Sequence, residues 1–199
     1  MDIYGYHRPD MEKIMHGMVS KIEEICRTKD GDRLFDHISY RIKSDMSTRE
    51  KLRRLEIPEN EENALRKITD SIGIRVVCLF IDDIDECVRI IQEIPGCTVI
   101  KKKDYIRNAK PNGYRSYHMI LEIPSVVSAL NETKKGPYFV EVQLRTIAMD
   151  TWAALEHELK YKKNISNSEL IIKELHRCAN DLAACDVSMQ TIRRIIRDS

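Results

Sequence analysis

One segment of the chain combines cations with aromatic rings in a pattern suited to holding a nucleotide. Residues 101–118 contain a single acid, Asp104, although the whole chain has a net charge of only +1. Their cations are Lys101, Lys102, Lys103, Arg107, Lys110 and Arg115. Tyr105, Tyr114 and Tyr117 lie among these cations and offer flat rings on which a base can stack. The segment therefore favours a ligand with phosphates and a base; a solvated basic loop, which most charge runs are, is the alternative.

A second group of cations is expected on a strand and on the helix that follows it. Residues 37–43 alternate with a period of two, which predicts a strand with two cations on one face. The Ser-x-x-Glu spacing over residues 47–50 predicts the start of a short helix, in which two cations three residues apart share a side. Such a set suits a triphosphate, while a solvated helix face is the simpler alternative. The cations are Arg41, Lys43, Lys51 and Arg54.

Two further strands carry charged side chains that need an explanation. The run from Ile72 to Phe80 is too apolar for a solvated face, so it predicts a central strand, and Arg75 stands in its middle. A guanidinium there is costly unless it meets a carboxylate, a phosphate or a base; a structural ion pair is the alternative. Residues 139–146 alternate cleanly, with Glu141, Gln143 and Arg145 on the face opposite the apolar side chains.

The composition is typical of a soluble globular protein and argues against some classes of partner. With 199 residues, 42% hydrophobic and 33% charged, the chain suits one domain with helical additions. It contains no apolar run of about 18 residues, which excludes a membrane-spanning helix, and its N-terminus lacks the plan of a secretory signal, so we expect a cytoplasmic protein. The cysteines are scattered and are expected to be small core residues rather than zinc ligands. The low net charge argues against duplex DNA as a partner and leaves RNA open.

The order of periodic segments predicts an α+β fold. Helices are expected over residues 10–28, 47–55, 61–68, 82–94, 148–162 and 166–196, and strands over 37–43, 72–80, 97–100, 117–123 and 139–146. Residues 125–137 are expected to form a flexible connection. The last helix has an apolar stripe that is long for one domain to cover. We therefore expect part of it to be buried in a homo-oligomer.

Several of these segments resemble one family. Lys-Asp-Tyr-Ile followed by Lys-Pro-Asn-Gly-Tyr-Arg-Ser-Tyr-His, within residues 103–118, resembles the signature loop of RelA/SpoT-type alarmone synthetases. Arg-Ile-Lys-Ser at 41–44, Glu-Val-Gln-Leu-Arg-Thr at 141–146 and Ala-Met-Asp-Thr-Trp-Ala-Ala-Leu-Glu-His at 148–157 resemble further motifs of that family. The resemblance runs from about residue 40 to 162, without a hydrolase module, and is that of a small, synthetase-only member.

The resemblance implies a fold, an activity and a cofactor. The fold is the nucleotidyltransferase-like synthetase fold, a mixed sheet of about five strands flanked by helices, with residues 1–163 as the synthetase domain and 164–199 as a helical extension for oligomerisation. The implied activity is that of a GTP or GDP pyrophosphokinase, which moves the β,γ-pyrophosphate of ATP to the 3′-hydroxyl of GDP or GTP and makes the alarmone (p)ppGpp of the stringent response. Mg²⁺ is the implied cofactor, and the family suggests a tetramer.

The resemblance also implies roles for individual residues. Asp70 and Glu141 hold the metal, and Glu141 is the catalytic carboxylate. ATP is bound by Arg41, Lys43, Ser44, Lys51, Arg54 and Arg75. The acceptor is bound by Lys103, Lys110, Asn112, Tyr114, His118 and Gln143, with Tyr114 stacked on guanine.

Some questions stay open at the level of sequence. The family's Arg-x-Lys-Asp or Glu-x-Asp-Asp tetrad, linked to the choice between GTP and GDP, appears here as Lys-Lys-Lys-Asp at 101–104, so the preferred acceptor is not assigned. One rival is a toxic relative that pyrophosphorylates adenine nucleotides or the 3′ end of tRNA. The other is a non-catalytic module that binds nucleotides or RNA on the same fold.

Overall fold

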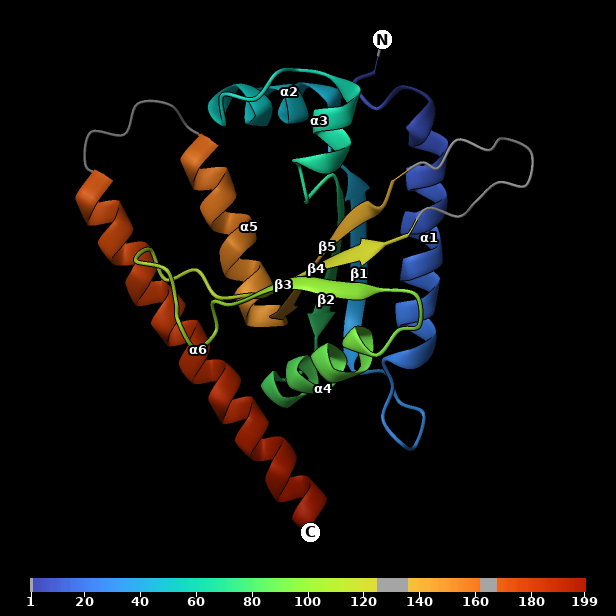
Figure 1. Ribbon diagram of the computed structural model, residues 1–199. Helices are drawn as coiled ribbons and strands as arrows, with labels where there is room; N and C mark the ends of the chain where they lie inside the picture. Colours follow the sequence, from blue (N-terminus) through green and yellow to red (C-terminus); the bar gives the residue numbers. More distant parts are fainter. Residues whose placement is uncertain (1, 125–135, 162–167) are drawn as a thin grey trace.

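The computed structural model describes residues 2–124, 136–161 and 168–199 (Figure 1). The boundary expected between residues 163 and 164 lies outside these ranges, as does nearly all of the connection expected over 125–137. The elements are η1 (Gly5–His7), α1 (Arg8–Ile25), β1 (Phe35–Ile42), α2 (Asp45–Arg54), α3 (Glu61–Arg66), β2 (Ile72–Cys78), α4 (Ile81–Gln92), β3 (Thr98–Asp104), β4 (Tyr117–Ile123), β5 (Tyr138–Thr146), α5 (Ile147–Tyr161) and α6 (Ser168–Asp198).

The strands form one five-stranded mixed sheet in the order β1-β2-β5-β4-β3. β2 runs parallel to β5, whereas the other neighbouring pairs are antiparallel. β5 is the middle strand, with Val140, Val142 and Leu144 fully buried. The predicted α+β fold, with about five strands flanked by helices and a long C-terminal helix, is confirmed.

The two faces of the sheet have different neighbours. In Figure 1, α1 lies on one side of the sheet and α5 and α6 lie on the other, with α2 and α3 at one end and α4 at the opposite end. The methionines of α1 supply much of its buried stripe, because Met11, Met15 and Met18 recur at helical spacing and face the core. The face of the sheet turned away from α1 is left for polar side chains.

Several expected boundaries differ from the structure by a few residues, and two of these differences matter for the site. β3 continues to Asp104 rather than ending at residue 100, because residues 101–104 pair with β4 in spite of their charge. α2 begins at Asp45 rather than near residue 47, because the side chain of Ser44 is the N-cap and accepts a hydrogen bond from Ser47 N at 3.3 Å.

The C-terminal helices also differ from expectation in their packing. The apolar residues Trp152, Leu155 and Leu159 predict that α5 packs against the sheet; Trp152 is instead buried against α6, where its indole N–H donates to Leu175 O at 2.8 Å, and Leu155 and Leu159 are exposed. α6 is fastened to α4 by the ion pair between Arg193 and the buried Asp83, 2.6 Å long. Much of the apolar stripe of α6 remains exposed, in particular Leu170, Met189, Ile192, Cys178 and Cys185; the two cysteines are therefore not the core residues that we expected.

None of the helices in the described ranges is both long and apolar enough to cross a membrane.

Candidate active site

Strand register lines up the polar side chains of the sheet in two adjacent rows. The first row crosses the strands as Arg41, Gly73, Glu141, Ile120 and Lys101. The second row crosses them as Ser39, Arg75, Gln143, His118 and Lys103. Because side chains two apart on a strand share a face, both rows lie on the face turned away from α1. The extension of β3 therefore carries alternate lysines into the site, while Lys102 points away to Gln92, at 2.6 Å.

Two cavities lie over these rows and meet at the two predicted carboxylates. The larger, of about 340 Å³, is lined by Ser39, Tyr40, Arg41, Lys43, Asp70, Gly73, Ile74, Arg75, Glu141 and Gln143. The smaller, of about 130 Å³, is lined by Lys51, Thr69, Asp70, Lys101, Lys103, His118, Ile120 and Glu141. Asp70 and Glu141 line both cavities, so they face the same side of the sheet and stand between two separate spaces.

Asp70 is held between two lysines at the entry to β2. Lys43 Nζ lies 2.9 Å from Oδ2, and Lys51 Nζ lies 2.8 Å from Oδ1. Each carboxylate oxygen is therefore paired with one ammonium group. Burial tends to raise the pKa of this carboxyl, but the two ammonium groups outweigh it and hold the pKa below its ordinary value. Asp70 is therefore ionised at neutral pH.

Glu141 is oriented by its neighbours on β4 and β5. His118 Nδ1 lies 3.1 Å from Oε1, and Gln143 Nε2 donates to Oε2 at 2.8 Å. Burial acts to raise the pKa of Glu141, but these two partners hold it below its ordinary value. Because an ionised carboxylate only accepts hydrogen bonds, the imidazole donates to it from Nδ1.

A chain of hydrogen bonds continues from that imidazole to a pair of arginines. The hydroxyl of Tyr114 lies 2.8 Å from His118 Nε2 and accepts from Arg145 Nη2 at 2.7 Å. Arg145 Nη1 and Arg75 Nη1 lie 3.0 and 3.2 Å from the same atom, Asp150 Oδ1. One carboxylate oxygen on α5 thus joins the arginine of the larger cavity to the tyrosine of the acceptor loop.

Arg75 keeps unused binding capacity even in this pair. Its Nε is buried without a hydrogen-bond partner. Burial lowers the pKa of its guanidinium, and the neighbouring charge of Arg145 lowers it further. Two guanidiniums held by one carboxylate leave net positive charge beside the larger cavity, which is what an anionic ligand needs.

The loop over residues 105–116 gathers rings and cations around Tyr114. The ring of Tyr114 makes edge contacts with the rings of Tyr105 and Trp152, at centroid distances of 5.9 and 6.3 Å. Lys110 Nζ lies over the rings of Tyr105 and Tyr114, 4.7 and 4.6 Å from their centroids. A base that stacks on Tyr114 needs the space of that ammonium, so Lys110 has to move toward the phosphates when such a ligand binds.

Comparison with known proteins places this arrangement in a family. Residues 40–166 match the model described as "Region found in RelA / SpoT proteins". The chain belongs to the RelA/SpoT family.

Named relatives are similar over most of the chain. GTP pyrophosphokinase YwaC of Bacillus subtilis (strain 168) is 36% identical over 165 residues, which is 82% of this chain and 76% of YwaC. GTP pyrophosphokinase YjbM of the same strain is 31% identical over 180 residues, which is 89% of this chain and 81% of YjbM. The crystal structure of the small alarmone synthetase 1 from Bacillus subtilis bound to its product pppGpp has a TM-score of 0.80 at 28% identity and covers 96% of both chains.

Within this RelA/SpoT-family chain, most residues predicted for the site line the two cavities. The larger cavity takes Arg41, Lys43, Arg75 and Gln143, and the smaller takes Lys51, Lys103 and His118, so Lys51 lies on the side predicted for the acceptor.

Five predicted residues line neither cavity, and two of them, Lys110 and Tyr114, lie in the loop described above. Ser44 caps α2, and Arg54 is exposed on α2. Asn112 donates from Nδ2 to Glu156 Oε1 at 3.0 Å, which fastens the acceptor loop to α5. Their binding roles stay predictions.

Sequence reasoning assigned no role to Arg145 or Asp150. Arg145 was expected on the face of Glu141 and Gln143, and Asp150 belongs to the matched motif on α5, but periodicity gives no sign of the bond between them. The signal that could have found it is the demand of a buried guanidinium for a carboxylate on the next helix.

Proposed function

We propose that this chain is a GTP pyrophosphokinase that transfers the β,γ-pyrophosphate of ATP to the 3′-hydroxyl of GDP or GTP. The carrying observation is that two cavities with cationic walls meet at Asp70 and Glu141, in a chain similar along most of its length to two GTP pyrophosphokinases. A transfer between two nucleotides needs two spaces that open onto one reacting centre.

The larger cavity suits the donor. Arg41 and Arg75 offer planar guanidiniums, which stack on a base or bind phosphate in a bidentate manner, and Lys43 adds a point charge next to Asp70. A structure of the same Bacillus subtilis synthetase bound to the ATP analogue AMPCPP has a TM-score of 0.74 to this chain at 27% identity. The smaller cavity and the Tyr114 loop then receive the guanosine nucleotide, whose phosphates meet Lys101 and Lys103.

The carboxylates fit Mg²⁺. Both are ionised and both line both cavities, so they present carboxylate oxygens, which Mg²⁺ prefers, where the two spaces meet. Within the described ranges, no cluster of three or more His, Cys, Asp or Glu side chains forms a complete protein cage. Mg²⁺ tolerates such a site because it usually keeps waters and takes substrate phosphate oxygens as ligands. When bound, the ion would supply charge stabilisation at the phosphates.

The chain's own residues account for the proton and the charge. In the transfer, the 3′-oxygen forms a bond to the β-phosphorus of ATP while the bond from that phosphorus to the α,β-bridging oxygen breaks, and AMP leaves. Glu141 accepts the hydroxyl proton or orients the hydroxyl, and His118 fixes the carboxylate for that task at 3.1 Å. The surrounding lysines and arginines neutralise charge on the transferred group.

A nucleotide separation tests the proposal. Purified protein is incubated with ATP and Mg²⁺ and with GDP, GTP, AMP, tRNA or no acceptor, and the products are resolved by anion-exchange chromatography. We expect equimolar AMP and ppGpp or pppGpp only when a guanosine nucleotide is present. Transfer of the pyrophosphate to an adenine nucleotide or to tRNA would indicate the toxin-like activity. No turnover with any acceptor would indicate a binding module.

The exposed stripe of α6 supports a homo-oligomer, for which the family suggests a tetramer. Leu170, Ile172, Val187, Met189, Ile192, Ile195 and Ile196 are about half exposed or more. We also place the protein in the cytoplasm, where its nucleotide substrates are. Light scattering coupled to size-exclusion chromatography measures the assembly, and a monomer at micromolar concentration would overturn this part of the proposal.

A further inference from the structure

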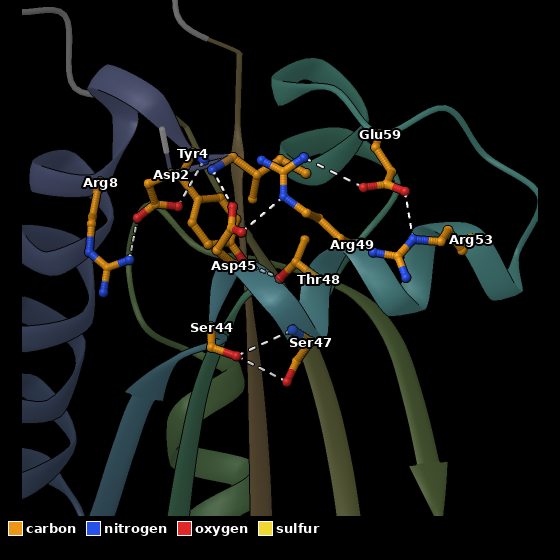
Figure 2. A network of polar contacts seen from close by, with 11 residues as sticks. Asp2, Tyr4, Arg8, Ser44, Asp45, Ser47, Thr48, Arg49, Arg53 and Glu59 are labelled. Atoms are coloured by element: carbon orange, nitrogen blue, oxygen red, sulfur yellow. Dashed lines mark hydrogen bonds and ion pairs between the residues drawn. The ribbon is translucent and has the colours of Figure 1, made fainter.

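The first residues of the chain lie outside the region that matches the family, yet they contact a helix of the candidate site. Figure 2 shows Asp2 and Tyr4 next to α2, the helix that carries Lys51. Ile3 N donates to Asp45 Oδ1 at 2.7 Å, and Ile3 and Tyr4 are buried, the latter with 0% of its surface exposed. The N-terminal segment, residues 2–5, is therefore part of the packed structure rather than a loose end.

The hydroxyl of Tyr4 makes the deepest polar contact of this segment. It lies 2.6 Å from Thr48 Oγ1 on α2, and Thr48 is itself completely buried. The side chain of Ser71 lies near the same hydroxyl. The Ser71 hydroxyl in turn donates to the backbone oxygens of Ala64 and Ile68, at 3.0 and 2.9 Å, so it is rigidly placed.

Thr48 and Ser71 adjoin the two residues of the central ion pair. Thr48 stands three residues before Lys51, so the two share a side of α2. Ser71 directly follows Asp70. Lys51 Nζ lies 2.8 Å from Asp70 Oδ1. The phenol hydroxyl thus bonds the helix of the lysine and lies near the turn of the aspartate, behind their contact in the cavity.

Other contacts hold the segment and α2 in a single geometry. Asp45 binds Arg49 at 2.9 Å, and Glu59 binds Arg53 at 2.6 Å, which fastens α2 to the connector that follows it (Figure 2). Gly5 has a φ of +49°, and a Cβ at this position would overlap the carboxylate of Glu61. The turn after Tyr4 therefore needs glycine.

We propose that Tyr4 is a positioning residue for the donor half of the site, and that the N-terminal segment sets the distance between α2 and the Asp70 turn. The proposal rests on the proposed function, in which Asp70 holds Mg²⁺ at the ATP phosphates; Lys51 lines the smaller cavity but pairs with Asp70, so we count it with the donor half. Without the hydroxyl, Thr48 loses its hydrogen-bond partner and Ser71 a polar neighbour, and Lys51 and Asp70 are no longer held at the separation that the ligand needs.

The test compares two tyrosine-to-phenylalanine variants that each lose one buried hydroxyl. Tyr138 is the matched control: it is 2% exposed and its hydroxyl lies 2.7 Å from His7 Nδ1, but it touches neither α2 nor the Asp70 turn. Binding of AMPCPP with saturating and limiting Mg²⁺ is measured by calorimetry, well below the melting temperature of each variant. We expect Tyr4→Phe to weaken binding about 3- to 10-fold, the usual worth of one hydrogen bond, and Tyr138→Phe to leave it unchanged.

A second variant keeps the proposal testable if Tyr4→Phe folds poorly. Thr48→Val has nearly the same shape and removes the same hydrogen bond from the side of α2, so it should weaken binding to a similar extent. Wild-type affinity in a folded Tyr4→Phe or Thr48→Val protein would overturn the positioning role, as would an equal loss in Tyr138→Phe. Failure of the wild-type protein to bind AMPCPP would instead count against the proposed function, so the two failures are distinguishable.

Discussion

The donor and acceptor halves of the site hold their cations in different ways. On the donor side, the ammonium groups of Lys43 and Lys51 lie 2.9 and 2.8 Å from the mostly buried carboxylate of Asp70, on elements fixed by strand pairing and helix capping. On the acceptor side, Lys110 rests on two tyrosine rings within a loop. Breaking a buried ion pair costs about 3–5 kcal/mol, whereas an exposed cation–π contact is worth about 0.5–1 kcal/mol. The donor half is therefore preorganised, and the acceptor half releases its cation readily to a ligand.

The largest expected effect comes from removing the carboxylate shared by both halves. Glu141→Ala should lower the rate of transfer by about 10³-fold or more, because a group that stabilises charge at the reacting centre is lost. The fold should remain, since Glu141 lies on the cavity face and not in the apolar core. Turnover is measured by nucleotide chromatography and folding by circular dichroism.

Glu122→Ala provides the matched control for this prediction. Glu122 lies on β4, on the same face as His118 and Ile120, but it lines neither cavity. Its variant should keep wild-type turnover. Comparable turnover in Glu141→Ala would remove that carboxylate from the mechanism.

Substitution of Tyr114 in the acceptor half should give the next largest effect. Tyr114→Ala should raise the KM for the guanosine nucleotide about 10- to 100-fold and leave the KM for ATP nearly unchanged, because base stacking is worth about 1–3 kcal/mol. Tyr114→Phe keeps the ring and loses the hydroxyl bonds to His118 and Arg145, so it should lower kcat more than it raises that KM. Equal changes of both KM values in Tyr114→Ala would contradict the separation of the halves.

Strand periodicity was sufficient to predict which segments of the chain form strands and on which face of its strand Glu141 lies. The alternation of residues 139–146 predicts that face directly, and the burial of Val140, Val142 and Leu144 agrees with it. The proximity of Asp70 to Glu141 came from the family motifs, because no local pattern pairs β2 with β5 across more than sixty intervening residues. Register between distant strands is a tertiary property.

Local sequence patterns gave the wrong end for β3 and the wrong start for α2. Residues 101–104 looked like a loop because lysines are unfavourable in strands, but backbone pairing with β4 places alternate lysines over the cavity and the remaining one toward solvent. The Ser-x-x-Glu spacing over residues 47–50 predicted that α2 starts at Ser47, but Ser44 has the extended backbone of an N-cap, with φ −62° and ψ 152°. The role of Tyr4 had no signal at all, because its partners are 44 residues away or more.

The two halves should also differ in how much their lysines contribute to the free energy of unfolding, and this effect is smaller than the effects on turnover and KM. Lys51→Met leaves Asp70 with less of its ionic compensation, so it should lower the free energy of unfolding by about 1–2 kcal/mol. Lys110→Met removes only contacts with two rings and should lower it by less than about 1 kcal/mol. Urea denaturation without nucleotide gives both values, and a larger loss in Lys110→Met would reverse our ranking of the two regions.

The smallest expected effect is the response to mild acid. The pKa values of Asp70 and Glu141 are both below their ordinary values, so the folded state binds protons at these sites less readily than the unfolded chain does. Their contribution to stability is therefore fully present above the unfolded pKa values of about 4 and is lost as the pH falls through the lower, folded values.

Between pH 5.5 and 8, neither carboxylate should change its charge, and AMPCPP affinity with saturating Mg²⁺ should be nearly constant. Calorimetric titrations across that range check this prediction. In Lys51→Met the compensation of Asp70 is weaker, so its pKa rises and the loss of affinity on acidification should begin at a higher pH than in the wild-type protein. Identical pH profiles in the two proteins would show that Lys51 does not control the ionisation of Asp70, and the donor half would then be less preorganised than its ion pairs indicate.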